Sequence, residues 1–136
     1  MKIHTDLKLR VIADTTDMPW MPSPVNGIDR KMLERDGDEV ARATSLVLYA
    51  PNSSFTPHQH ELGEEFLVLD GVFQDELGQY PAGTYVKNPP GSSHTPFTET
   101  GCTLFVKLRY QDPSDDERVV IDTQSAEWHQ GLVPGL

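Results

Sequence analysis

The sequence is poor in cysteine and in basic residues, and it lacks any long apolar run. Its single cysteine, Cys102, cannot form a disulfide within the chain, which favours a reducing compartment. The 11 basic residues stand against 21 acidic ones, and a net charge of −10 disfavours nucleic acids and anionic membranes as partners. No apolar stretch is long enough for a transmembrane helix, and the first residues lack the apolar region of a signal peptide. These absences predict a cytoplasmic protein with no nucleic-acid or membrane partner, and they leave a small-molecule ligand open.

Proline and glycine are frequent, with eleven and ten residues, and they interrupt the chain at short intervals. Short apolar and β-branched segments lie between these turn residues, and no segment has a helical period. The pattern predicts an all-β sandwich or barrel. Gly71 is expected to end one strand before the next begins. We expect strands at residues 7–13, 43–50, 55–60, 65–69, 72–77, 84–87, 102–110 and 118–122.

The length of 136 residues suits a single domain. We expect residues 1–40 to form an N-terminal strand and a Pro-rich wall segment, residues 41–122 to form the barrel, and residues 123–136 to form a C-terminal arm. The end of the arm, residues 128–136, shares a Trp, a Val, a Gly and a terminal aliphatic residue with residues 20–28. This likeness is either chance or the start of a second copy of the domain.

Four side chains from separate parts of the chain form a candidate metal site. His58 and His60 are two residues apart, so on a strand they share a face. Glu64 follows after a short turn, and His94 lies beyond a Pro/Gly turn on a neighbouring strand. Three imidazoles and one carboxylate suit a divalent transition metal.

The same residues resemble the two motifs of the cupin family. Gly-x5-His-x-His-x3-Glu-x6-Gly is matched by His58, His60, Glu64 and Gly71, with Asn52 replacing the first glycine. Asn tolerates the left-handed backbone that glycine adopts there. The second motif is matched by Gly83, Pro89, Gly91 and His94, with Thr98 at its final Asn position. The resemblance covers roughly residues 40–110 and implies a single-domain jelly-roll barrel.

Within the cupins, residues 63–73 and 80–96 resemble the cupin domain of ChrR-like proteins. The resemblance implies His58, His60, Glu64 and His94 as metal ligands, with Glu65 as the rival carboxylate. It implies zinc, while Fe(II), Mn(II) and Ni(II) occur elsewhere among cupins. ChrR-like proteins also carry a zinc-binding anti-sigma domain, which we do not expect here, so sigma-factor binding is not carried over.

Two functions remain open from the sequence. One is a sensory or small-molecule-binding cupin that uses its metal without turnover. The other is a metal-dependent dioxygenase or hydrolase acting on a small carbonyl compound, with catalytic residues that the sequence does not identify. Because a single small barrel leaves exposed strand edges, we expect a homodimer.

The sequence also gives expectations for single positions. Cys102 is expected to be a small buried residue of the core. Asp75 and Glu76 are expected to be solvated. Lys107 and Arg109 are expected to point outward into solvent.

Overall fold

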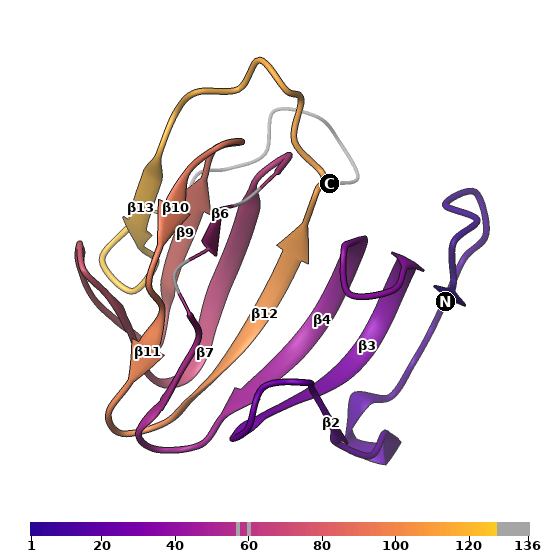
Figure 1. The fold of residues 1–136 in the computed structure, drawn as a ribbon, viewed down its shortest axis with the longest axis horizontal. Helices are drawn as coiled ribbons and strands as arrows, with labels where there is room; N and C mark the ends of the chain where they lie inside the picture. Colours follow the sequence, from indigo (N-terminus) through magenta and orange to yellow (C-terminus); the bar gives the residue numbers. More distant parts are fainter. Residues whose placement is uncertain (57, 60, 128–136) are drawn as a thin grey trace.

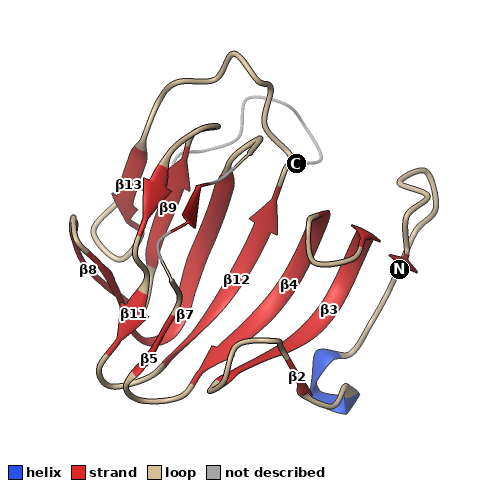
Figure 2. Cartoon of the chain, in the orientation of Figure 1, coloured by secondary structure: helices blue, strands red, loops and turns tan. Residues whose placement is uncertain are grey.

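A computed structural model describes residues 1–56, 58–59 and 61–127, with the backbone alone at residues 58 and 59. This part of the chain is built of short antiparallel strands (Figures 1 and 2). A single turn of 3-10 helix, η1 (Thr15–Asp17), precedes the second strand. The strands are β1 (Lys2–Ile3), β2 (Met21–Pro22), β3 (Ile28–Gly37), β4 (Ala41–Tyr49), β5 (Ser53–Ser54), β6 (His58–Gln59), β7 (Glu64–Asp75), β8 (Gly78–Pro81), β9 (Thr84–Asn88), β10 (Ser93–His94), β11 (Phe97–Thr98), β12 (Cys102–Leu108) and β13 (Val119–Asp122).

The sheet is organised around β7, the longest strand described. Its first half pairs with β12 on one side and with β9 on the other, and its second half pairs with β8 and β11. The order β3-β4-β12-β7 forms the broad wall of the molecule, and β13 extends it beyond β9 (Figure 1). A separate pair, β6 and β10, lies off this sheet. This curved, all-antiparallel arrangement confirms the predicted all-β fold.

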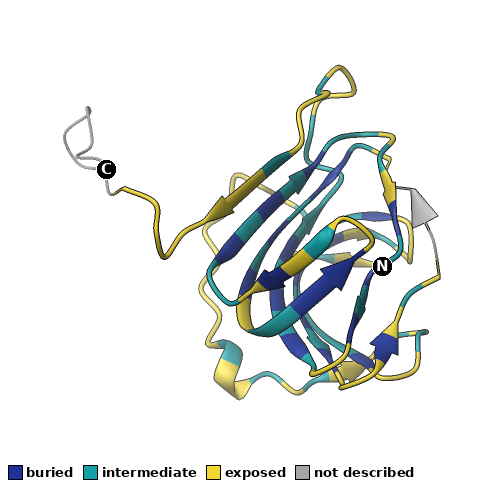
Figure 3. Ribbon diagram, turned by 90° about the vertical axis from the view of Figure 1, so that its left-hand side faces the viewer, coloured by how far each residue is buried: buried dark blue, intermediate teal, exposed yellow. Residues whose placement is uncertain are grey.

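Every second side chain of the main strands points into the interior. Figure 3 shows this as alternating buried and less buried positions along the strands. The central residue is Phe73, whose ring centroid lies 4.9 Å from that of Phe66 and 5.5 Å from that of Tyr49. Edge-to-face ring pairs at such distances are stabilising beyond their apolar area. The buried apolar cluster consists of Ile28, Val47, Tyr49, Phe66, Val68, Phe73, Tyr80, Val86, Cys102, Leu104 and Val106.

The inner face changes from apolar to polar toward one end of the barrel. Along β9 the buried positions run from Val86 to Asn88, and along β7 from Phe66 back to Glu64. On β4 the buried Ser45 interrupts the apolar positions between Ala43 and Val47. Because buried polar groups need partners, this end of the interior is where a ligand or ion is expected.

Two local predictions are confirmed. Asn52 adopts a φ of 60°, the left-handed backbone expected where it replaces a glycine. The Pro-rich segment lies along the wall, since β2 pairs with β3 and the Lys31 Nζ lies 4.5 Å from the centre of the Trp20 ring.

Two strand predictions are wrong. Residues 7–13 form no strand, and Leu7, Leu9 and Ile12 are exposed. Their alternation has no neighbouring strand to pair with, and alternation without a partner does not hold a strand. The break predicted at Gly71 is also absent, because β7 continues through this residue to Asp75.

Other boundaries stay as predictions. The division at residues 40 and 122 is one of them, and the likeness of residues 128–136 to residues 20–28 falls outside the described residues. In the described part of the chain, no helix has the length and apolar character to cross a membrane.

Candidate metal centre

Three buried polar side chains meet at the polar end of the interior. Glu64 opens β7, Asn88 closes β9, and His94 closes β10, and each is at most 9% exposed. Asn88 Nδ2 donates to Glu64 Oε2 over 3.4 Å. The side-chain amide of Gln111 donates to the backbone carbonyl of Asn88 over 3.0 Å, which fixes the end of β9 beside the start of β7.

The imidazole of His94 lies between two carboxylates. Its Nε2 is 3.4 Å from Glu64 Oε2, and its Nδ1 is 3.3 Å from Asp75 Oδ2. Burial disfavours the imidazolium, but the hydrogen bond to Asp75 and the charge of Glu64 outweigh burial and raise the pKa of His94. With Nδ1 held by Asp75, Nε2 is the nitrogen that faces Glu64.

Asp75 is a functional candidate that sequence reasoning missed. It is 6% exposed, so the expectation that it is solvated is wrong. Its Oδ1 accepts hydrogen bonds from the Tyr80 hydroxyl and from the Leu77 backbone N–H, both over 2.9 Å. Burial opposes ionisation, but the bonds from His94, Leu77 and Tyr80 together lower the pKa of Asp75.

The hydrogen bonds that hold Asp75 extend to a residue in the C-terminal part of the chain. Arg118, just before β13, donates from Nη2 to the Tyr80 hydroxyl over 2.8 Å. Burial, with the hydrogen bond to Asp75, raises the pKa of Tyr80 to about 12, so this hydroxyl keeps its proton and donates it to Asp75. A chain of contacts thus runs from Arg118 through Tyr80 and Asp75 to the ring of His94.

The two candidate carboxylates point in different directions. Glu64 is buried beside His94, whereas the half-buried Glu65 accepts a hydrogen bond from the Tyr85 hydroxyl over 3.2 Å. The two are consecutive residues of β7, and neighbouring side chains of a strand point to opposite faces of the sheet. Gly63, just before them, has a φ of +81°, a conformation that residues with a side chain rarely adopt. A Cβ at Gly63 would stand 2.3 Å from the side-chain amide of Gln111, so the glycine also makes room for the residue that holds β7 and β9 together.

The other two predicted ligands are described only in part. The backbone of His58 in β6 pairs directly with that of His94 in β10, while its side chain and the whole of His60 lie outside the described residues. Among the side chains that are described, no group of three or more His, Cys, Asp or Glu residues is arranged to hold a metal ion. The structure therefore brings Glu64 and His94 together and leaves the full set of four as a prediction.

The donor chemistry at this point fits a divalent metal. A neutral imidazole and a carboxylate are common ligands of zinc and of related metals. A metal-binding His almost always donates its other ring nitrogen to a carboxylate or carbonyl, and Asp75 stands at that nitrogen of His94.

Thr98, at the Asn position of the second cupin motif, has a structural role. Its hydroxyl donates to the Val72 carbonyl over 2.6 Å and accepts from the Gly101 backbone N–H over 3.0 Å. Cys102 is 3% exposed and belongs to the apolar cluster, which confirms its expected place in the core.

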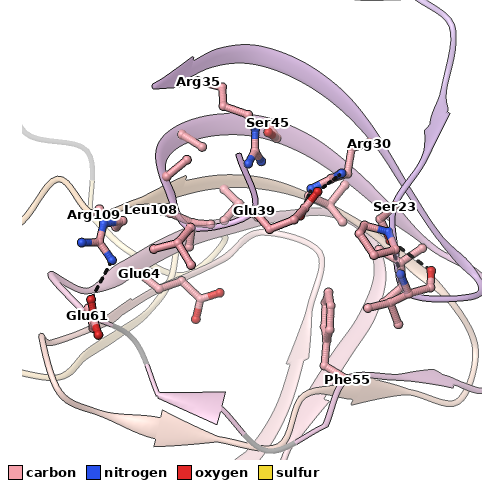
Figure 4. Close-up of a pocket in the computed structure, with 18 of the residues that line it drawn as sticks. Ser23, Arg30, Arg35, Glu39, Ser45, Phe55, Glu61, Glu64, Leu108 and Arg109 are labelled. Atoms are coloured by element: carbon pink, nitrogen blue, oxygen red, sulfur yellow. Dashed lines mark hydrogen bonds and ion pairs between the residues drawn. The ribbon is translucent and has the colours of Figure 1, made fainter. Parts of the chain in front are cut away.

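A cavity of about 490 Å³ opens beside Glu64 between the walls of the barrel (Figure 4). The Glu64 carboxylate points into it, and Phe55 stands at the opposite side. Its walls are mainly apolar, but Arg30, Arg35 and Arg109 also line it. The expectation that Arg109 points outward into solvent is therefore wrong, and Arg30 and Arg35 were not identified from the sequence. A volume of this size is typical of a small-molecule site.

The family model described as the ChrR cupin-like domain matches residues 8–112. A comparison with curated proteins found no match. The anti-sigma ChrR of Rhodobacter sphaeroides, solved in complex with SigE, is 24% identical over 68% of this chain and 50% of that chain, with a TM-score of 0.58. The present chain thus spans about half the length of that protein.

Two further solved structures have similar scores. An acetylacetone dioxygenase from Acinetobacter johnsonii is 20% identical over 79% of this chain and 77% of that chain, with a TM-score of 0.59. An RmlC-like cupin protein from Ralstonia eutropha is 21% identical over 90% of this chain and 82% of that chain, with a TM-score of 0.62. At these identities the likeness establishes a shared fold and leaves the reaction open.

Proposed function

Because the chain belongs to the family of ChrR cupin-like domains, we propose that it binds one divalent metal ion and uses it in a sensory or small-molecule-binding role. The proposed ligands are His58, His60, Glu64 and His94. The observation that carries the proposal is the buried contact of 3.4 Å between Glu64 Oε2 and His94 Nε2. Two residues 30 positions apart in sequence meet there at the edge of a cavity large enough for a small molecule.

The surroundings of His94 support a ligand role for Nε2. Asp75 accepts at Nδ1, which fixes the ring orientation and leaves Nε2 directed at Glu64. A metal ion bound there would supply a Lewis acid that polarises a carbonyl or carboxyl oxygen of a ligand. Asn88, through its bond to Glu64, would hold the carboxylate in place.

Zinc is the metal that we propose, with Fe(II), Mn(II) and Ni(II) as alternatives, because the donor types suit all four. The test is elemental analysis of protein purified without added metal, compared with His58→Ala and His94→Ala. We expect about one equivalent of metal in the parent protein and a loss in both variants. His4→Ala is the matched control, since His4 is exposed and its ring nitrogen contacts the Leu33 carbonyl. Equal metal content in all four proteins would rule the proposal out.

The second candidate is a metal-dependent dioxygenase or hydrolase that acts on a small carbonyl compound. The cavity beside Glu64 favours it, because a substrate can reach the proposed metal there. Oxygen uptake with acetylacetone and related carbonyl compounds, using protein loaded with Fe(II), separates the two functions. Turnover supports the enzyme, whereas bound zinc without turnover supports the sensory or binding role.

We further propose that the protein is a homodimer with no nucleic-acid or membrane partner. The edge strand β13 exposes Val120 and Ile121, which are 44% and 41% exposed and could be covered by a second copy. The net charge of −10 opposes binding to polyanions. A monomeric species in light scattering would contradict the dimer.

A further inference from the structure

Among the described residues, the cavity beside the proposed metal site is lined by one arginine that forms no ion pair, although the charges of Glu39, Glu34 and Asp38 act on it from farther away. Arg30 forms an ion pair of 3.0 Å with Glu39. Arg109 forms another of 3.0 Å with Glu61. The third arginine, Arg35, pairs with no carboxylate within the described ranges, although it is the most deeply buried of the three.

A β-bulge turns Arg35 toward the cavity. The pairing of β3 with β4 shifts between Met32 and Glu34, so Leu33 is an extra residue on β3. The shift exchanges the two faces of the strand, and Arg35 lines the cavity while Glu34 does not. The bulge therefore places an arginine, and not a glutamate, at the wall of the cavity.

Three donors of the cavity lining, on Arg30, Arg35 and Ser45, are buried without an acceptor in the described part of the chain, and those of Arg35 and Ser45 lie side by side. Arg35 is 3% exposed, and its Nη1 donates to the carbonyl of Asp38, while its Nε is buried without a hydrogen bond. Ser45 is 5% exposed, and its hydroxyl is buried without a partner. Figure 4 shows the two side chains next to each other above the cavity. Burial and the nearby Arg30 lower the pKa of Arg35, so an anion beside it would be stabilising.

We propose that this cavity binds a small monocarboxylate, with the carboxylate on Arg35 and Ser45 and an apolar body along the cavity wall. The Nε side of a guanidinium presents two parallel donors that match the two oxygens of a carboxylate. The Ser45 hydroxyl supplies a third donor. Val25, Ile28 and Leu108 offer the apolar wall.

The balance of charge favours a single negative charge on the ligand. Arg30 and Arg109 form ion pairs with Glu39 and Glu61, and Glu64, the third carboxylate of the lining, contacts His94, so Arg35 is the arginine of the lining that lacks an ion pair. A phosphate dianion would leave one charge buried without a partner, which is costly. The chemistry of the site therefore favours a carboxylate.

The far end of such a ligand would lie next to Glu64, whose carboxylate points into the same cavity. That placement rests on the proposed function, because it puts the far end beside the metal ion. The recognition of the carboxylate by Arg35 and Ser45 does not depend on the metal.

The test is isothermal titration calorimetry with hexanoate, with hexanamide as the neutral analogue and with hexylphosphonate as the dianion, at a pH alkaline enough to remove the second proton of the phosphonate. We expect hexanoate to bind and the other two to bind at least about tenfold more weakly. Arg35→Met should weaken the binding of hexanoate by about tenfold to a hundredfold. Arg10→Met removes the same charge from an exposed position and should leave the affinity unchanged. Equal binding of hexanoate and hexanamide, or no binding of hexanoate, would overturn the proposal.

Ser45→Ala keeps the test decisive if Arg35→Met does not fold. Because the buried Ser45 hydroxyl has no partner among the described residues, its removal should leave the urea midpoint unchanged or higher. Hexanoate should nevertheless bind about threefold to tenfold more weakly. An unchanged affinity would count against the site.

Metal content, measured in the same proteins, separates this inference from the proposed function. Parent protein that contains no metal but binds hexanoate through Arg35 would refute the metal centre alone. Parent protein that contains metal but does not bind hexanoate would refute the carboxylate site alone.

Discussion

The carboxylate of Asp75 lies 3.3 Å from Nδ1 of His94, on the side of the ring opposite Glu64. Asp75 comes from the far end of β7, the same strand whose first residue is Glu64. One strand thus contributes both carboxylates that flank the imidazole, because β7 bends between its two halves.

This relationship predicts that Asp75→Asn weakens metal binding by about tenfold to a hundredfold. An amide at this position accepts a weaker hydrogen bond from Nδ1 and carries no charge, so the ring is oriented less firmly. Competition with a chromophoric chelator measures the affinity. Asp70→Asn removes an exposed carboxylate of the same strand and should leave the affinity unchanged. An equal loss in both variants would show that net charge matters and the position of Asp75 does not.

Loss of the Tyr80 hydroxyl should lower the stability of the folded protein. Tyr80→Phe removes the donor to Asp75 and the acceptor of Arg118 while the ring still fills the core. We expect the free energy of unfolding to fall by about 1–2 kcal/mol, because a buried carboxylate loses one of its hydrogen bonds. Urea unfolding provides the measurement. The half-buried Tyr85, whose hydroxyl meets Glu65, is the comparison, and Tyr85→Phe should cost less than about 0.5 kcal/mol.

The thiol of Cys102 should be nearly inert in the folded protein. Burial raises its pKa to about 11, so at pH 8 only about one thiol in a thousand is ionised. Reaction with a disulfide reagent at pH 8 should therefore be much slower in native protein than in urea-unfolded protein. Equal rates would mean that the residue is accessible and reactive.

The same pKa has a consequence for stability at high pH. The pKa of Cys102 in the folded protein lies above that of an unfolded cysteine. Its contribution to the free energy of unfolding is therefore fully present below about pH 8.5. It is lost progressively as the pH rises from there toward about 11. Urea midpoints of the parent and Cys102→Ala, measured between pH 7 and 11 on a grid of about one pH unit, should therefore converge toward the alkaline end. A constant difference would contradict this assignment.

Position 71 should require glycine, although it lies inside a continuous strand. Its φ is +74°, and a Cβ would stand 2.1 Å from the backbone carbonyl oxygen of Gly101. Gly71→Ala should lower the free energy of unfolding by about 2–4 kcal/mol through strain and overpacking. Gly78→Ala is the control, since the nearest atom would lie 3.7 Å away, and it should change stability by less than about 0.5 kcal/mol.

The sequence was sufficient for the class of fold and for most strands. Alternation within residues 43–50 and 102–110 identifies β4 and β12, because each strand has one face in the core and the other toward solvent. The motif positions Asn52 and Gly71 require left-handed backbone, and both adopt it. The motifs also identified Glu64 and His94 as neighbours, because cupin spacing reflects a fixed turn and strand pairing.

Tertiary structure alone decided which other polar residues join the site. Asp75 follows a segment that a local pattern divides at Gly71, and its burial depends on β7 continuing past that glycine to meet His94. The inward direction of Arg35 depends on the extra residue Leu33, which changes the face of β3 without any local signal. Residues 7–13 show the converse, since their alternation is present but no strand pairs with them. Local sequence determines the period of a strand, while pairing and bulges determine which face meets the interior.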